Sequence, residues 1–256
     1  MGPREQLLEA WSRVRGWYPV TMAGRKYRCD PDHISFWDRV SEGDWEPQTF
    51  TILDNLLDQE AVYCDIGTWI GPTVLHAAMQ CRKVYCMEPD RVAYMYLLQN
   101  LKLNQLENVV PFNIALSSSN MLSRMASPRG KRGDSMTSLL RPEGSGNTEV
   151  PCLSWLTWFD LVGQPEITAI KMDIEGGEFK LLPTMENYLC ESRPGLYLSL
   201  HPHLLRMPER YAAMQRVVDV LQVYSTCYDD MGREISLETL MEEQAINRAG
   251  SYLLLP

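Results

Sequence analysis

The sequence predicts an α/β fold in which a mostly parallel sheet carries helices on both faces. Three observations predict it. From residue 61 onward, short apolar runs alternate with amphipathic segments of helical length, which is the pattern of βαβ units. The first run ends in a glycine-rich turn at residues 65–71, and later runs end on acidic residues or a histidine. Ligands of such sheets bind beyond the carboxyl ends of the strands, so a site is expected there.

The N-terminal part of the chain is predicted to precede this regular pattern as a separate extension. Apolar residues recur at helical spacing within 4–17, and residues 18–30 have the pattern of a short hairpin with a glycine turn. Pro47 is placed to begin a helix, since proline loses no backbone donor in a first turn. We therefore expect a helix and hairpin extension at 1–46, packed on the core, and the main domain at 47–256.

The main domain is expected to contain seven strands and the helices between them. Strands are predicted at 61–66, 83–87, 108–116, 167–172, 195–200, 223–227 and 251–255. Helices are predicted at 72–79, 91–103, 178–189 and 209–221.

Residues 117–150 are expected to form one long irregular insert, rich in Ser, Gly and Pro. Arg124, Arg129, Lys131 and Arg132 cluster in it. A solvated surface loop is one interpretation. The other is a lid with positive charge for an acidic substrate, because long loops in compact domains are often functional.

Composition and charge restrict the class of partner. The chain has 33 acidic and 24 basic side chains and a net charge of -9, which disfavours nucleic acid and anionic membranes as partners. No run approaches the roughly 18 apolar residues of a membrane span, and the first residues lack the apolar core of a signal peptide. Seven cysteines without a C-x-x-C pair indicate reduced, buried thiols. We expect a cytoplasmic protein with a small-molecule partner.

The turn Asp65-Ile66-Gly67-Thr68-Trp69-Ile70-Gly71 is the first candidate ligand site. Its glycines allow a sharp bend from strand to helix and the close approach of a ligand, although such a turn also occurs as plain structure. Glu88 ends the next run, 23 positions after Asp65. An acid at about this spacing binds a ribose diol in nucleotide-binding folds. The pair indicates a cofactor that contains adenosine.

The chemistry of this turn favours S-adenosylmethionine over NAD. A dinucleotide site needs G-x-G-x-x-G, which is absent, and Asp65 would repel a pyrophosphate. S-adenosylmethionine has no phosphate, and its ammonium and sulfonium groups tolerate a carboxylate. The P-loop pattern is also absent.

Acidic residues and a histidine follow two later strands and are the candidates for catalysis. Asp173, Glu175 and Glu178 come after the fourth strand, and His201 and His203 after the fifth. In one interpretation Asp173, Glu175 and His201 bind a divalent cation. Carboxylates alone would suit Mg²⁺, whereas an imidazole would favour Mn²⁺, Fe²⁺ or Zn²⁺. In another, Asp173 orients the ring of His201, which takes a proton.

Plain structural interpretations of these residues also remain. In these interpretations Glu178 does no more than stabilise the start of a helix through the helix dipole, and His201 does no more than cap local backbone. His33 and His76 are expected to be structural.

Four motifs together resemble the FkbM family of S-adenosylmethionine-dependent methyltransferases over residues 43–205. They are Asp65-Ile66-Gly67-x-x-Ile70-Gly71, Glu88-Pro89, Asn100-x-x-x-Asn104 and Ile170-Lys171-Met172-Asp173-Ile174-Glu175-Gly176-Gly177-Glu178. The resemblance implies a Rossmann-like class I methyltransferase fold: seven strands, the last antiparallel. It also implies O-methylation of sugars, polyketides or other natural products.

The resemblance further implies roles for single residues. Asp65, Gly67 and Gly71 would line the methionine part of the cofactor, Glu88 would hold the ribose, and Asp173 would lie near the methyl transfer. Further cofactor-binding candidates are Thr68, Pro89, Asn113 and Glu46. The chain departs from the family at Thr68 and Trp69, where Ala and Asn are usual, and at Pro72, where an aromatic is common.

Two other functions compete with this interpretation. An NAD-dependent sugar oxidoreductase or epimerase would need G-x-G-x-x-G and commonly Tyr-x-x-x-Lys, and the sequence has neither. The alternative of a non-catalytic adenosine-binding protein would be contradicted if substitution of Asp173 and His201 abolished activity and left cofactor binding intact. The sequence leaves the acceptor open between a sugar hydroxyl, another natural product and an amine, and it leaves the oligomeric state open.

Overall fold

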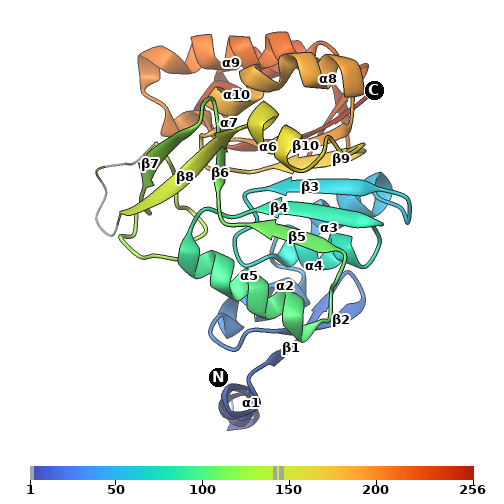
Figure 1. The fold of residues 1–256 in the computed structure, drawn as a ribbon, viewed down its shortest axis with the longest axis vertical. Coiled ribbons are helices and arrows are strands. Elements are labelled where there is room, and N and C mark those ends of the chain that lie inside the picture. Colours follow the sequence, from blue (N-terminus) through green and yellow to red (C-terminus); the bar gives the residue numbers. More distant parts are fainter. Residues whose placement is uncertain (1–2, 141–142, 144–146) are drawn as a thin grey trace.

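The computed structural model describes residues 3–140, 143 and 147–256 (Figure 1). Its N-terminal part contains α1 (Pro3–Arg15), β1 (Tyr18–Met22), β2 (Arg25–Cys29), α2 (Ile34–Glu42), α3 (Pro47–Leu56), β3 (Val62–Ile66), α4 (Pro72–Ala78), β4 (Lys83–Met87) and α5 (Arg91–Leu103). The middle contains β5 (Val109–Phe112), β6 (Ala115–Ser117), β7 (Met121–Met125), β8 (Thr148–Ser154), α6 (Trp155–Leu161), β9 (Ala169–Met172), α7 (Glu178–Leu181) and α8 (Glu186–Ser192). The rest contains β10 (Gly195–Leu200), α9 (Met207–Leu221), β11 (Thr226–Asp229), β12 (Glu234–Ile235), α10 (Glu243–Asn247) and β13 (Gly250–Leu255).

The main sheet has the strand order β12-β11-β13-β10-β9-β3-β4-β5. The pairs from β5 to β10 are parallel, and β13 runs antiparallel to both β10 and β11. This confirms the predicted mostly parallel sheet whose last strand is antiparallel. The difference from seven strands is β12, a short edge strand that forms a hairpin with β11.

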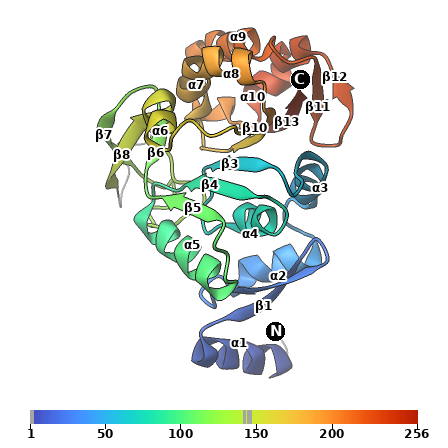
Figure 2. The same ribbon diagram turned by 45° about the vertical axis from the view of Figure 1, so that its right-hand side comes forward.

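Helices cover both faces of this sheet, as Figures 1 and 2 show. On one face, strand residues such as Ile66 and Leu198 pack with α6, α7, α8 and α9. On the other face, strand residues such as Tyr63 and Val84 pack with α2, α3, α4 and α5. All five residues of β3 are buried, because this central strand is covered on both sides.

The N-terminal hairpin and α2 share a core with the helices α3, α4 and α5. The hairpin turns at Ala23 and Gly24, which both have positive φ. Two asparagines of the sequence motif hold this part in place. Asn100 exchanges hydrogen bonds with Asp30 and donates to the carbonyl of Ile70, while Asn104 pairs with the backbone of Arg28.

Two features of the N-terminal part were not anticipated. The helix α2 was not predicted, although it buries Ile34, Trp37 and Val40 at helical spacing. The helix α1 forms as predicted, but its apolar side faces solvent, with Leu7 71% and Val14 79% exposed.

The prediction of one irregular insert at 117–150 was wrong. β6, β8 and β7 form a separate three-stranded sheet (left in Figure 1), and β7 and the first three residues of β8 lie within that range. The predicted strand at 108–116 is accordingly split between two sheets, because the chain leaves the main sheet after Phe112. Residues 141–142 and 144–146 of the insert lie outside the described residues.

Two other predicted elements differ from the structure. The helix expected at 178–189 is broken by a 3-10 turn over Leu182–Met185, where Pro183 has no amide hydrogen to donate. The strand expected at 223–227 lies at Thr226–Asp229, since α9 is followed by a turn in which Tyr224 bonds back to Leu221.

Two expectations drawn from composition concern the burial of the cysteines and the presence of membrane-spanning helices. Six of the seven cysteines are buried, whereas Cys190 on α8 is exposed, contrary to the expectation. No helix among the described residues combines the length and apolar character needed to cross a bilayer.

Candidate functional site

The candidate residues converge at the carboxyl edge of the main sheet. β3 lies between β4 and β9, and β10 follows β9, so the loops after these four strands meet at one place. The glycine turn follows β3, Glu88 follows β4, Asp173 and Glu175 follow β9, and His201 follows β10. The fourth and fifth predicted strands are neighbours, because β9 pairs in parallel with β10.

Asp65 is fully buried at the end of β3, beneath the glycine turn. Its Oδ2 accepts hydrogen bonds from Thr73 Oγ1 at 2.6 Å and from Tyr63 OH at 3.1 Å. Its Oδ1 has no hydrogen-bond partner among the described residues and lies 4.0 Å from Nζ of Lys171. Burial raises the pKa of Asp65, and the Lys171 ammonium opposes that rise.

At Gly67 a side chain is sterically excluded by backbone atoms of a neighbouring loop. The φ of Gly67 is +90°, and a Cβ atom would lie 1.9 Å from the carbonyl oxygen of Asp173. The turn after β3 therefore packs directly on the loop after β9. The neighbouring Thr68 is buried, and its hydroxyl has no partner among the described residues.

Glu88 is buried where β4 ends, and its carboxylate faces the glycine turn. Oε2 accepts from the backbone N–H of Trp69 at 2.8 Å, and Oε1 accepts from that of Asp90 at 2.7 Å. Burial raises the pKa of Glu88 to about 8, against the lowering effect of these two hydrogen bonds.

Two cavities adjoin at this edge and share six lining residues: Gly67, Trp69, Asp134, Ser135, Asp173 and Glu175. The inner cavity is bounded by Glu88 and Pro89 and is otherwise largely apolar. Its apolar wall includes Met87, Ile114, Leu116, Met125 and Leu139. The outer cavity has a volume of about 410 Å³, within the range of small-molecule sites. Its wall includes Phe36, Arg39, Trp45, Glu46, Arg129 and Lys171.

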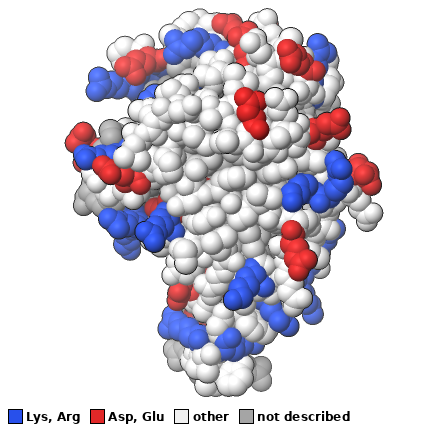
Figure 3. Space-filling model, viewed as in Figure 1, with Lys and Arg blue, Asp and Glu red and all other residues white. Residues whose placement is uncertain are grey.

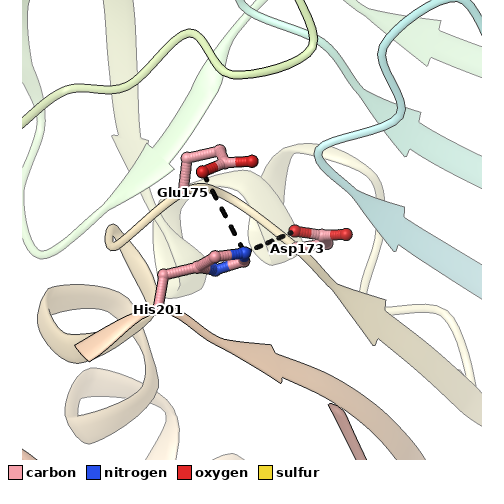
Figure 4. Close-up of side chains that lie close together, drawn as sticks. All are labelled: Asp173, Glu175 and His201. Carbon is pink, nitrogen blue, oxygen red and sulfur yellow. Dashed lines mark ion pairs between the residues drawn. The ribbon is translucent and has the colours of Figure 1, made fainter. Parts of the chain in front are cut away.

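Asp173, Glu175 and His201 form a compact cluster (Figure 4). Nε2 of His201 lies 3.8 Å from Oδ1 of Asp173 and 4.0 Å from Oε2 of Glu175. One ligand atom from each of the three residues lies within 4.8 Å of the others, a spacing that could hold a metal ion. Oδ2 of Asp173 is also 3.5 Å from Nζ of the buried Lys171.

The ring of His201 is oriented by Glu178 and not by Asp173. Nδ1 of His201 lies 2.6 Å from Oε1 of Glu178, whose side chain is completely buried at the start of α7. Glu178 is thus the partner that sequence reasoning missed. The signal was present, because Glu178 stands at the end of the same acidic motif.

Protonation in this cluster differs from the sequence-based expectation. Burial lowers the pKa of His201, but the hydrogen bond and charge of Glu178 outweigh it and raise that pKa to about 9. Burial raises the pKa of Glu175 to about 7. At neutral pH His201 is therefore already protonated, and Glu175 is the group poised to accept a proton.

Some of the remaining predicted cofactor residues line a cavity, and others do not. Thr68 and Glu46 line the outer cavity, and Pro89 lines the inner one. Asn113 and Gly71 line neither. Asn113 instead donates to the backbone carbonyls of Glu88 and Pro89, and so holds the loop after β4 in position.

The two histidines expected to be structural have partners away from the cavities. Nδ1 of His33 lies 2.7 Å from Asp30, and Nε2 of buried His76 lies 2.8 Å from Asp54.

Part of the insert is fastened over the inner cavity. The indole N–H of Trp69 donates to the carbonyl of Gly133, and the N–H of Gly133 donates to Asp90. The hydroxyl of Ser138 donates to the carbonyl of Glu175. The insert therefore connects the loops after β3, β4 and β9.

The sheet order, with one antiparallel strand between β10 and β11, and the acidic glycine turn at its carboxyl edge define a class I methyltransferase. The family model "Methyltransferase FkbM domain" matches residues 65–223. The chain therefore belongs to the FkbM family of S-adenosylmethionine-dependent methyltransferases. Residues 1–64, including α2 and α3, precede the matched segment.

Individual relatives are distant. The chain is 33% identical over 57 residues to "Uncharacterized protein MJ1452" of Methanocaldococcus jannaschii, which is 22% of each chain. It resembles the crystal structure of methyltransferase FkbM from Methylobacillus flagellatus KT with 16% identity and a TM-score of 0.48, covering 77% of this chain and 44% of that one. It resembles an rRNA methylase from Streptococcus thermophilus with 14% identity and a TM-score of 0.46, covering 81% of this chain and 92% of that one.

Proposed function

We propose that this protein transfers the methyl group of S-adenosylmethionine to a hydroxyl group of a small molecule, such as a sugar or another natural product. The observation that carries the proposal is the position of Asp173 and Glu175. Their side chains line both the inner and the outer cavity, so they stand where a cofactor and an acceptor would meet.

The residues at the edge of the sheet fit S-adenosylmethionine. Glu88 would hold the ribose hydroxyls at the inner cavity, whose apolar wall suits an adenine ring. Two buried polar atoms without a partner, Oδ1 of Asp65 and Oγ1 of Thr68, lie around the turn that would hold the methionine part. Such atoms are costly unless a ligand or water satisfies them. Gly67 lines both cavities, and its missing side chain lets the turn pack on the loop after β9.

Methyl transfer to an alcohol is an in-line displacement. The acceptor oxygen forms a bond to the methyl carbon as the sulfur–carbon bond breaks, and S-adenosylhomocysteine leaves. The hydroxyl proton passes to the carboxylate of Glu175, whose pKa of about 7 suits a base at neutral pH. The imidazolium of His201, fixed by Glu178, places positive charge beside Asp173 and Glu175 and keeps the two carboxylates together.

A divalent cation is a second form of the same proposal. Asp173, Glu175 and His201 would be its ligands, and it would lower the pKa of the acceptor hydroxyl. This form requires His201 to lose its proton, since only a neutral imidazole is a ligand. Chelation distinguishes the two forms: only the metal form predicts that EDTA abolishes turnover and that Mg²⁺ or Mn²⁺ restores it.

The experiment is a methyl-transfer assay with radiolabelled S-adenosylmethionine and a panel of sugar, polyketide and phenol acceptors. The variants Asp173→Asn and Glu175→Gln should still bind S-adenosylhomocysteine in calorimetry but lose transfer. Glu107→Gln, at an exposed position before β5, is the matched control and should keep both. Binding of NAD without binding of S-adenosylhomocysteine would overturn the proposal in favour of an oxidoreductase.

A further inference from the structure

The outer cavity indicates which class of acceptor it binds. We propose that the acceptor carries an acidic group, a carboxylate or a phosphate, which Arg39 and Arg129 bind at the rim of the outer cavity while Phe36 and Trp45 support its ring or apolar part. This inference rests on the proposed function, because it assigns the outer cavity to the acceptor.

The aromatic residues form a continuous wall on one side of the outer cavity. The ring of Phe36 meets that of Trp45 at 5.1 Å and that of Trp69 at 4.6 Å, both edge to face. All three side chains line the cavity. Edge-to-face packing holds the rings in place, so a flat or apolar face of an acceptor finds a fixed surface.

The two arginines reach the same cavity from opposite parts of the chain. Arg39 projects from α2, before the segment that matches the family model, and Arg129 comes from the insert. Both side chains are exposed, which places them at the mouth of the cavity and not at its floor. Guanidinium groups bind carboxylates and phosphates with paired hydrogen bonds, so this position suits an acidic group of a ligand.

The charges that line the outer cavity leave Arg39 uncompensated. Oε2 of Glu46 accepts from Thr49, Asp134 lies 3.5 Å from Arg129, and Asp173 lies 3.5 Å from Lys171. Among the described residues, Arg39 has no carboxylate within ion-pair distance. Among those residues, the guanidinium group of Arg39 has one hydrogen bond, a long contact of 3.4 Å to the carbonyl of Asp44.

The outer cavity would have to bind an acidic ligand against the net negative charge of the protein. The chain carries a net charge of -9, yet Figure 3 shows Lys and Arg side chains beside acidic ones along the left side, where Figure 1 places the insert. Three basic side chains and four carboxylates line the outer cavity, so the positive charge open to an acidic ligand there is that of Arg39, which has no carboxylate partner among the described residues.

The test compares ligands that differ only in charge. Wild-type protein saturated with S-adenosylhomocysteine is titrated with 4-hydroxybenzoate and with its neutral counterpart 4-hydroxybenzamide, and separately with glucose 6-phosphate and glucose. Quenching of tryptophan fluorescence reports binding, because Trp45 and Trp69 line the outer cavity. In at least one pair the charged member should bind ten times more tightly or better. The pair that shows this difference identifies the acid as a carboxylate or a phosphate.

The double variant Arg39→Gln with Arg129→Gln should abolish this preference for the charged member. Arg82→Gln is the matched control, because Arg82 is exposed and lies before β4, at the opposite edge of the sheet. Equal binding of charged and neutral members, an undiminished preference in the double variant, or no saturable binding of any probe at 10 millimolar would each overturn the inference.

The proposed function is judged by a separate measurement. Calorimetry of S-adenosylhomocysteine on the same samples tests it. If the cofactor product fails to bind while the charge preference persists, the function is wrong and the anion site stands. If the cofactor product binds and the preference for the charged ligand is absent, the proposed function stands and the anion site is wrong.

Discussion

Glu88 gives the sharpest test of the cofactor site, because its protonation and its proposed partner are linked. Burial raises its pKa from 4.5 to about 8, so the free protein carries a mostly neutral Glu88 at pH 6. Ribose hydroxyls donate to the ionised form, and hydrogen bonds to a charged group contribute about 1.5–3 kcal/mol. Binding therefore requires that Glu88 lose its proton, and the affinity for S-adenosylhomocysteine should rise with pH.

The magnitude follows from the pKa. If only ionised Glu88 binds the ribose, the affinity falls about tenfold for each pH unit below a pKa of about 8. Calorimetry with S-adenosylhomocysteine between pH 6 and pH 8 should show a rise of about fiftyfold, because about half of Glu88 is ionised at pH 8 and about one hundredth at pH 6. Glu88→Gln should bind at least about tenfold more weakly than wild type at pH 8. That variant should also lose the part of the pH dependence that belongs to residue 88. An affinity that is flat over this range in the wild type would refute the reasoning.

Three further predictions concern the cluster and the turn. The kcat/KM of the wild type should rise with pH through about 7 as Glu175 ionises, and Glu175→Gln should lose that limb and about 10²–10⁴ of the rate. The folded-state pKa of His201 is raised from 6.5 to about 9, so the stability it contributes is complete below 6.5 and lost as pH rises through 9. Thermal melts between pH 6.5 and 9.5 should therefore show a steeper fall for wild type than for His201→Gln, and equal slopes would contradict the protonated pair with Glu178. Gly67→Ala should destabilise the fold by more than about 3 kcal/mol in urea unfolding, because its Cβ would lie 1.9 Å from a backbone oxygen. Gly163→Ala, with φ +81° and open space around it, should cost only about 1–2 kcal/mol, and an equal loss in both variants would remove the role of the close contact.

The sequence by itself determined the sheet, the turn and the positions of the acids. Periodicity of apolar residues is a local property, and strands that end at Asp65, Glu88 and Asp173 must bring those ends to one edge once the strands are parallel. The antiparallel last strand came from the family resemblance. These features depend on local sequence patterns or on a short motif, so they could be predicted from the sequence alone.

Only the tertiary structure decided what each acid touches. The pairing of Glu178 with His201 joins residues 23 positions apart on different elements, and it reverses the protonation expected for the histidine. No local pattern encodes this, because a pKa depends on burial and on charges brought together by packing. The departure of β6 from the main sheet was likewise decided by packing, against a strand pattern that runs through residues 108–116.

The outer cavity is the clearest case of a feature that tertiary structure alone created. Its wall joins Phe36 and Arg39 of α2 with Arg129 of the insert and Lys171 of β9, residues that are up to 135 positions apart. The sequence showed that the insert is basic and that the acids follow β9, but it predicted neither α2 nor its approach to them. That approach depends on buried hydrogen bonds between Asn100 and Asp30, which are distant in the chain and adjacent only after folding.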